Sequence, residues 1–204
     1  AGDVRQGGIG DCFLLSAVAA VASARPNMLR ELFVRHDVAK GVYGVRLFLN
    51  GAWTYVVVDD LVAVDDDGDL LFAKCADASE VWLPVLEKAV AKACCCFENI
   101  DGGRVEWALE VLTGGLADVR EKLLVHELEP AECWRKVAAL LKRGDVLAVS
   151  SYDDDDYAKK GFEFDAVDEE LAGEGVLRCG LVSGHAYALL GVAEHEGARL
   201  YKLR

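Results

Sequence analysis

Two residues far apart in the sequence have side chains suited to nucleophilic chemistry, Cys12 and His185. Cys12 opens the apolar, alanine-rich run of residues 12–24, directly after a glycine-rich loop. At the first turn of a buried helix, free backbone N–H groups and the helix dipole favour a thiolate. His185 opens an apolar strand over residues 184–192. If the fold brings the two together, the imidazole takes the thiol proton and later protonates a leaving amine.

Gln6 lies in the same glycine-rich loop as the thiol. Its amide and the backbone N–H of Cys12 are donors that a tetrahedral oxyanion requires. Purely structural roles for these residues remain open at this point, since a cysteine at a helix start is commonly a small core residue. A histidine at a strand edge is also commonly a packing residue, and a distant cysteine and histidine are by themselves a weak signal.

The elements that must position these residues follow from periodicity and breakers. Helices are predicted over residues 12–24, 27–34, 79–97, 104–112 and 129–142, and strands over 43–49, 53–58, 70–73, 146–150, 184–192 and 198–203. Asp11 and Ser79 are the expected N-caps. The acidic runs 65–69 and 153–156 are interpreted as solvated loops. Gly114-Gly115 marks the expected boundary between a helix-rich lobe, residues 1–115, and a strand-rich lobe, residues 116–204.

Composition excludes several classes of protein. Apolar residues make up 53% of the 204, which argues against a disordered chain. A net charge of −13 disfavours nucleic acid and anionic membranes as partners. No run reaches the roughly 18 apolar residues of a membrane span. The seven cysteines form neither a disulfide framework nor a zinc pattern, so reduced thiols in the cytoplasm are expected. The oligomeric state cannot be read from the sequence.

Several motifs in order resemble those of the calpain family of cysteine proteases. The stretch QGGIGDCFLLSA around Cys12 resembles the calpain nucleophile motif, with Phe13 in place of the usual tryptophan. The helix EVWLPVLEKAVAK, which begins at Glu80, and GHAY, which contains His185, resemble two further family motifs. The resemblance runs over nearly the whole chain and is weakest over residues 150–177.

The resemblance implies an α+β, papain-like fold in which a helical lobe with the nucleophile helix precedes a partial, β-rich lobe. It implies a calcium-dependent endopeptidase that performs limited proteolysis of intracellular proteins through a thiol acyl-enzyme. Cys12 carries over as nucleophile, His185 as base and Gln6 as oxyanion donor. In calpains an asparagine orients the histidine, and the resemblance places it just after Arg204. The chain is therefore expected to be truncated before this residue, and to be weakly active or inactive alone.

The resemblance also implies a regulatory Ca²⁺ site in the first lobe, with Asp3 and Glu80 as carboxylate ligands. Carboxylate oxygens suit calcium, although two residues are too few for six to eight oxygens. The acidic runs do not have EF-hand spacing. The Phe13 substitution is expected to change packing, and Trp53, Trp82 and Trp107 are expected in the core.

Two alternatives compete with an active protease. One is a non-catalytic, calpain-like regulatory or interaction protein, in which the nucleophile or the histidine is usually replaced. Both are intact here, which favours the enzyme. The other is a papain-fold transglutaminase, against which the paired nucleophile and GHAY motifs argue.

Overall fold

The structure is a computed structural model, and it describes residues 4–117, 128–159, 164–168, 174–178 and 180–204. In the first half the elements are β1 (Val4–Arg5), α1 (Cys12–Ala24), α2 (Pro26–Leu32), β2 (Phe33–Asp37), η1 (Val38–Lys40), β3 (Val42–Leu49), β4 (Ala52–Asp59), β5 (Lys74–Cys75), α3 (Trp82–Ala93), η2 (Phe97–Ile100) and α4 (Val105–Thr113). The second half contributes α5 (Pro130–Arg143), β6 (Leu147–Ser150), α6 (Asp154–Lys159), β7 (Phe164–Asp168), β8 (Glu174–Leu177), β9 (Ala186–His195) and β10 (Ala198–Leu203). This mixture of helices and small sheets confirms the predicted α+β class.

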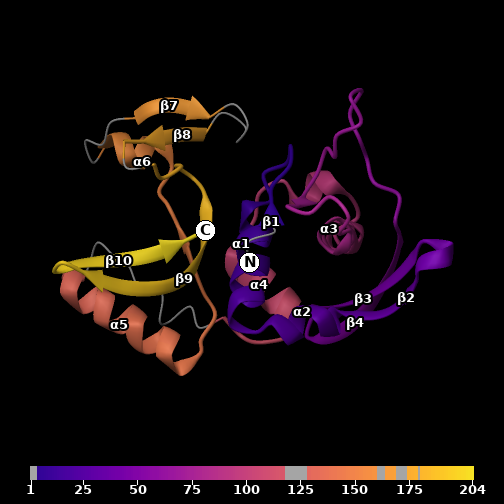
Figure 1. Cartoon of the computed structure of the whole chain (residues 1–204), viewed down its shortest axis with the longest axis horizontal. Helices are drawn as coiled ribbons and strands as arrows, with labels where there is room; N and C mark the ends of the chain where they lie inside the picture. The colour runs from indigo at the N-terminus through magenta and orange to yellow at the C-terminus, as the bar shows by residue number, and fades with distance from the viewer. Residues whose placement is uncertain (1–3, 118–127, 160–163, 169–173, 179) are drawn as a thin grey trace.

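Helix α1 lies at the centre of the molecule (Figure 1). Its residues are apolar on every face, and all those from Phe13 to Val21 are buried, as expected of a core helix. It packs against α2 and α4 from the first half and against β9 from the second. Ala19 and Ala20 form a cluster with Ala188, because small side chains let the strand approach the helix closely. Helix α1 therefore joins the two halves.

The first half is built on the antiparallel sheet β2-β3-β4, against which α3 and α4 pack. The β3–β4 hairpin turns at Asn50 and Gly51, which both have positive φ (51° and 80°), as a two-residue hairpin turn requires. Leu86, Leu47 and Leu14, from α3, β3 and α1, are buried in one core. Burying each of these side chains contributes about 1.5–3 kcal/mol.

The second half is built on the antiparallel sheet β10-β9-β6, with α5 packed against β9 (Figure 1). Cys133 and Val137 of α5 meet Leu189 of β9 in a small core. Strands β7 and β8 form a separate pair. The two ends of the described chain lie close together, since the Arg204 side chain donates a hydrogen bond to the Val4 carbonyl at 2.9 Å.

Several local predictions were wrong. The helix predicted over residues 79–97 is α3, which begins only at Trp82, because the Ser79 hydroxyl and backbone N–H both donate to Asp77 in a turn. The strand predicted over 70–73 is reduced to a single bridge at Leu70, and the pairing with β1 follows at β5. The acidic run 153–156 is not a loop, since Asp153 starts α6 by accepting the N–H of Asp156.

Within the described residues, no single helix is long and apolar enough to cross a membrane. The pair α1 and α2 would be long enough together, but it is bent by 120°.

Candidate active site

The glycine-rich loop before Cys12 is held between two other segments. The N–H of Gly8 donates to Leu71 O at 2.8 Å, and the N–H of Gly10 donates to the Asp101 carboxylate at 2.9 Å. A Cβ at Gly7 would come within 2.4 Å of the Phe72 backbone, so only glycine fits there. These contacts fix where α1 begins, and with it the position of Cys12.

A pocket of about 400 Å³ opens beside the N-terminal end of α1. Its lining comes from both halves of the chain: Cys12 and Phe13 of α1, residues 103–106 at the start of α4, Ser150 at the end of β6, and residues 184–186 at the start of β9. Cys12 and His185 therefore line the same pocket, although they lie near opposite ends of the sequence. A shared pocket is the first condition for a thiol and an imidazole to come within hydrogen-bond reach of each other.

The backbone of His185 is locked in place just before β9. Its N–H donates to the hydroxyl oxygen of Ser151 at 2.9 Å, and the N–H of Ser151 donates to His185 O at 2.9 Å. The Ser151 hydroxyl in turn donates to Val182 O at 2.7 Å. Preceding Gly184 has a positive φ of 59°, which turns the chain into the strand. These bonds hold the imidazole on the wall of the pocket.

The phenol ring of Tyr187 supports the imidazole of His185. The two rings meet edge to face, with centroids 5.0 Å apart. The Tyr187 hydroxyl accepts the N–H of Val182 at 2.7 Å, so the phenol is itself anchored. Tyr187 belonged to the GHAY motif but had no predicted role. Its position two residues after His185, on the same strand face, was the available signal. Ser151 had no comparable signal, because its contacts depend on the β6–β9 pairing.

Gln6 lies in the loop but is not among the residues that line the pocket. Its side-chain amide donates to Ile9 O at 2.8 Å, which braces the loop. An amide nitrogen carries two N–H groups, so this bond leaves a second donor.

Phe13 packs where the family resemblance expected tryptophan. It is buried, and its ring centroid lies 6.1 Å from that of Trp107. A Cβ at Gly103 would come within 2.5 Å of the Phe13 ring, so the start of α4 lies directly on this side chain. Of the tryptophans expected in the core, Trp53 is instead 38% exposed, with the guanidinium of Arg46 4.7 Å from its ring.

Of the two predicted calcium ligands, Glu80 lies in the part of the chain that the structure describes. Asp3 lies outside the described residues. Glu80 is exposed, and its carboxylate accepts the indole N–H of Trp82 at 3.1 Å. Among residues whose placement is described, no group of three or more Cys, His, Asp or Glu side chains is arranged to hold a metal ion.

Asp11 precedes α1 as predicted, but its carboxylate does not cap the helix. The side chain instead points into the core, where the residue is 0% exposed. Burial raises the pKa of Asp11 to about 6. Burial, and then the charge of Asp11, raise the pKa of Glu87 on α3 to about 9. Asp11 thus occupies the predicted N-cap position, but its side chain forms no capping hydrogen bond, because a neighbour distant in sequence competes for the carboxylate.

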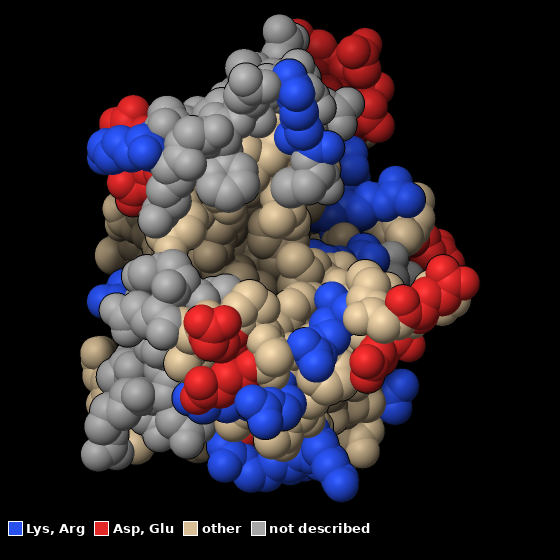
Figure 2. Space-filling model, turned by 90° about the vertical axis from the view of Figure 1, so that its left-hand side faces the viewer, with Lys and Arg blue, Asp and Glu red and all other residues tan. Residues whose placement is uncertain are grey.

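The overall negative charge does not extend evenly over the surface. On the face shown in Figure 2, Lys and Arg side chains gather along the lower edge, where α5 lies in Figure 1. This helix carries Arg135, Lys136, Lys142 and Arg143. The same face is hollowed at mid-height, between the β7–β8 pair and the β9–β10 hairpin.

Comparison with known proteins agrees with the geometry. The model of the calpain family of cysteine proteases matches residues 1–204. The chain is 32% identical over 99% of its length to the calpain-type cysteine protease DEK1 of Arabidopsis thaliana, and 30% identical over 95% of its length to the calpain-2 catalytic subunit of Homo sapiens. It spans 9% and 25% of the lengths of these two relatives. The chain thus belongs to the calpain family of cysteine proteases and is similar to the protease domain of its members.

Proposed function

We propose that this domain is a cysteine endopeptidase that cleaves proteins through a thioester acyl-enzyme. The observation that carries the proposal is the single pocket lined by both Cys12 and His185. A thiol and an imidazole that line one cavity are the minimum for acyl transfer from a peptide bond. Membership of a protease family supports the same reaction class.

In the proposed reaction, the imidazole of His185 takes the proton of the Cys12 thiol. The thiolate attacks the carbonyl carbon of the scissile peptide, and the carbonyl electrons move onto the oxygen. The N–H of Cys12 stabilises this oxyanion, and the family resemblance supports the second amide N–H of Gln6, in the adjoining loop outside the pocket lining, as a further donor. The imidazolium then protonates the leaving amine as the C–N bond breaks, which leaves a thioester. His185 deprotonates a water that attacks the thioester, and the released thiolate recovers the proton.

We also propose that proteolysis is limited, that the substrates are cytoplasmic proteins, and that calcium regulates the activity. The family resemblance supports the calcium dependence, with Asp3 and Glu80 as two of the ligands. Other ligands must then come from elsewhere in the protein, since calcium takes six to eight oxygens.

The proposal is tested by measuring cleavage of an unfolded, casein-like protein by the longest natural form of the chain, with and without calcium. Replacement of Cys12 by alanine abolishes cleavage. Replacement of His185 by alanine lowers kcat by about 10²–10⁴-fold, the contribution of a general base. His195→Ala is the matched control, because this histidine is exposed at the far end of the same strand, β9. Its activity stays near that of the natural protein.

Cleavage that persists in Cys12→Ala contradicts the assigned nucleophile. A natural protein that binds such substrates without cleaving them, at any calcium concentration, instead indicates the non-catalytic calpain-like alternative. Calcium-independent cleavage leaves the peptidase proposal intact and removes the calcium one.

A further inference from the structure

Asp11 and Glu87 place two carboxyl groups together in the core, next to the start of the nucleophile helix. Asp11 is 0% exposed and Glu87 is 1% exposed. The two carboxyl groups lie close enough to interact directly, and the charge of Asp11 raises the pKa of Glu87. Two ionised carboxylates only accept hydrogen bonds, so a hydrogen bond between them requires a proton on one of the two.

The surroundings of Asp11 leave its carboxylate dependent on that proton. Among the described residues, apart from the Asp11 N–H itself, neither carboxylate oxygen finds a donor on another backbone or on a neutral or basic side chain. The carboxylate of Asp101 is a further negative charge, and it also raises the pKa of Asp11. A buried carboxylate without a partner is costly, so the Glu87 proton is its main stabilising contact.

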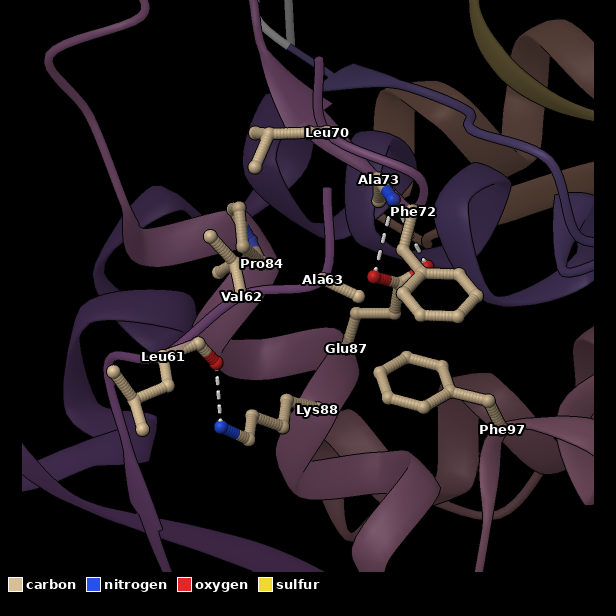
Figure 3. A pocket seen from close by; sticks show the side chains of 10 residues that line it. All are labelled: Leu61, Val62, Ala63, Leu70, Phe72, Ala73, Pro84, Glu87, Lys88 and Phe97. Carbon is tan, nitrogen blue, oxygen red and sulfur yellow. Dashed lines mark hydrogen bonds between the residues drawn. The ribbon is translucent and has the colours of Figure 1, made fainter. Parts of the chain in front are cut away.

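Glu87 is held in a different way, as Figure 3 shows. Both of its oxygens accept the backbone N–H of Ala73, at 3.2 and 3.1 Å. The neighbouring cation on α3, Lys88, is directed away, with its ammonium on Leu61 O and on the Asp59 carboxylate. No positive charge of the described residues therefore offsets a second negative charge in this pair. An apolar cavity of about 340 Å³, lined partly by Phe72 and Phe97, borders Glu87.

We propose that Asp11 and Glu87 share a single proton in the folded protein, and that this acid pair positions the first turn of α1 and hence the Cys12 thiol. The role of Cys12 in this statement rests on the proposed function. The pair itself is a positioning element, since neither carboxyl lines the pocket that contains Cys12 and His185.

The contacts explain how the pair acts on the thiol. Asp11 is covalently next to Cys12, and its carbonyl accepts the N–H groups of Leu14 and Leu15, which begin the helix. Glu87 ties this point to the middle of α3 and, through Ala73, to the segment that contacts the glycine loop. One proton thus connects three segments at the end of α1. Loss of this proton leaves two like charges in contact, and their repulsion drives the two carboxylates apart.

The first test detects the proton directly. At about pH 7.5 ordinary carboxyl groups are ionised, because their pKa values are near 4. The infrared carbonyl band of a protonated carboxylic acid is therefore expected for this buried pair, and it disappears in Glu87→Gln. The matched control is Glu98→Gln, which removes an exposed carboxylate and leaves the band unchanged. If the natural protein has no band that depends on Glu87, the shared proton does not exist.

The second test measures the positioning of Cys12 by its rate of alkylation with iodoacetamide, located by mass spectrometry. Glutamine at position 87 keeps both a donor for Asp11 and an acceptor for Ala73, so Glu87→Gln stays within about two-fold of the natural rate. Glu87→Met keeps the side-chain volume but removes both the donor and the acceptor. The alkylation rate of Cys12 then changes by roughly ten-fold or more, since displacement of reacting atoms by ~1 Å costs on the order of 10²-fold in rate.

The pH profile covers the case in which Glu87→Met does not fold. The ratio of the alkylation rate of the natural protein to that of Glu87→Gln is constant near neutral pH and departs from this value above about pH 9, where the pair loses its proton. An unchanged ratio through this range overturns the positioning role. Both readouts are independent of proteolysis, so a domain with the infrared band but no peptidase activity refutes the proposed function and not the shared proton.

Discussion

Replacing Glu87 by glutamine isolates the effect of one buried proton on the stability of the fold. The pKa of Glu87 is raised from 4.5 to about 9, mainly by burial and then by the charge of Asp11. Unfolded chains lose this proton near pH 4.5, whereas the folded protein keeps it until about pH 9. The folded state therefore binds one more proton throughout this window, and stability falls as pH rises through it.

The magnitude follows from this difference of one proton. The free energy of unfolding decreases by about 1.4 kcal/mol per pH unit for each extra proton that the folded state holds. Between about pH 6.5 and about pH 8.5 the loss is therefore about 2.7 kcal/mol. The Glu87 proton contributes fully to stability below the pKa of the unfolded chain. Its contribution is lost above the pKa of the folded protein. Asp11, with a pKa of about 6, adds a similar slope only at lower pH.

The assay is urea unfolding at several pH values in this range, with tryptophan fluorescence as the probe. The midpoint for the natural protein moves to lower urea as pH rises, while the midpoint for Glu87→Gln moves much less. Glutamine does not titrate, and it keeps the hydrogen bonds to Asp11 and Ala73. All other titratable groups are the same in both proteins, so their effects cancel in the comparison. Equal slopes for the two proteins would refute the assignment of the buried proton to this pair.

Three further substitutions test the packing and the site. Gly103→Ala places a Cβ within 2.5 Å of the Phe13 ring, so thermal or urea unfolding should show a loss of about 1–3 kcal/mol. Ser151→Ala removes the acceptor of the His185 N–H, which should cost about 1–3 kcal/mol in stability and lower kcat more than it changes KM. Glu80→Gln should raise the calcium concentration for half-maximal cleavage by at least ~10-fold, measured by calcium titration, whereas an unchanged requirement removes Glu80 from the proposed ligands.

Local chemistry explains which parts of the fold the sequence predicts. The helix over residues 12–24 was confirmed with its bounds, because an uninterrupted apolar run ends at Arg25-Pro26 and proline cannot continue it. The strands predicted over 43–49 and 53–58 were confirmed as β3 and β4, which pair because the Asn50-Gly51 dipeptide between them readily adopts positive φ. The family motifs indicated the fold class, which the periodicity of apolar residues alone left open.

Long-range contacts explain the failures. Asp11 has the residue type and position of an N-cap, yet its carboxylate turns inward to Glu87 on another helix. Ser79 also looked like an N-cap, but its hydroxyl is bonded to Asp77. The support of His185 by Ser151 depends on which strands pair. Such partners are separated by many residues, so local patterns carry no information about them.

The most direct test of the central claim is selective labelling of the seven cysteines with a thiol-directed peptidyl epoxide, read by mass spectrometry with calcium present. The proposed geometry predicts that Cys12 reacts far ahead of exposed Cys95 and Cys96, and that His185→Ala removes this advantage. If Cys12 reacts no faster than those exposed thiols, or if its rate is unchanged without the imidazole, the two residues do not form a catalytic pair.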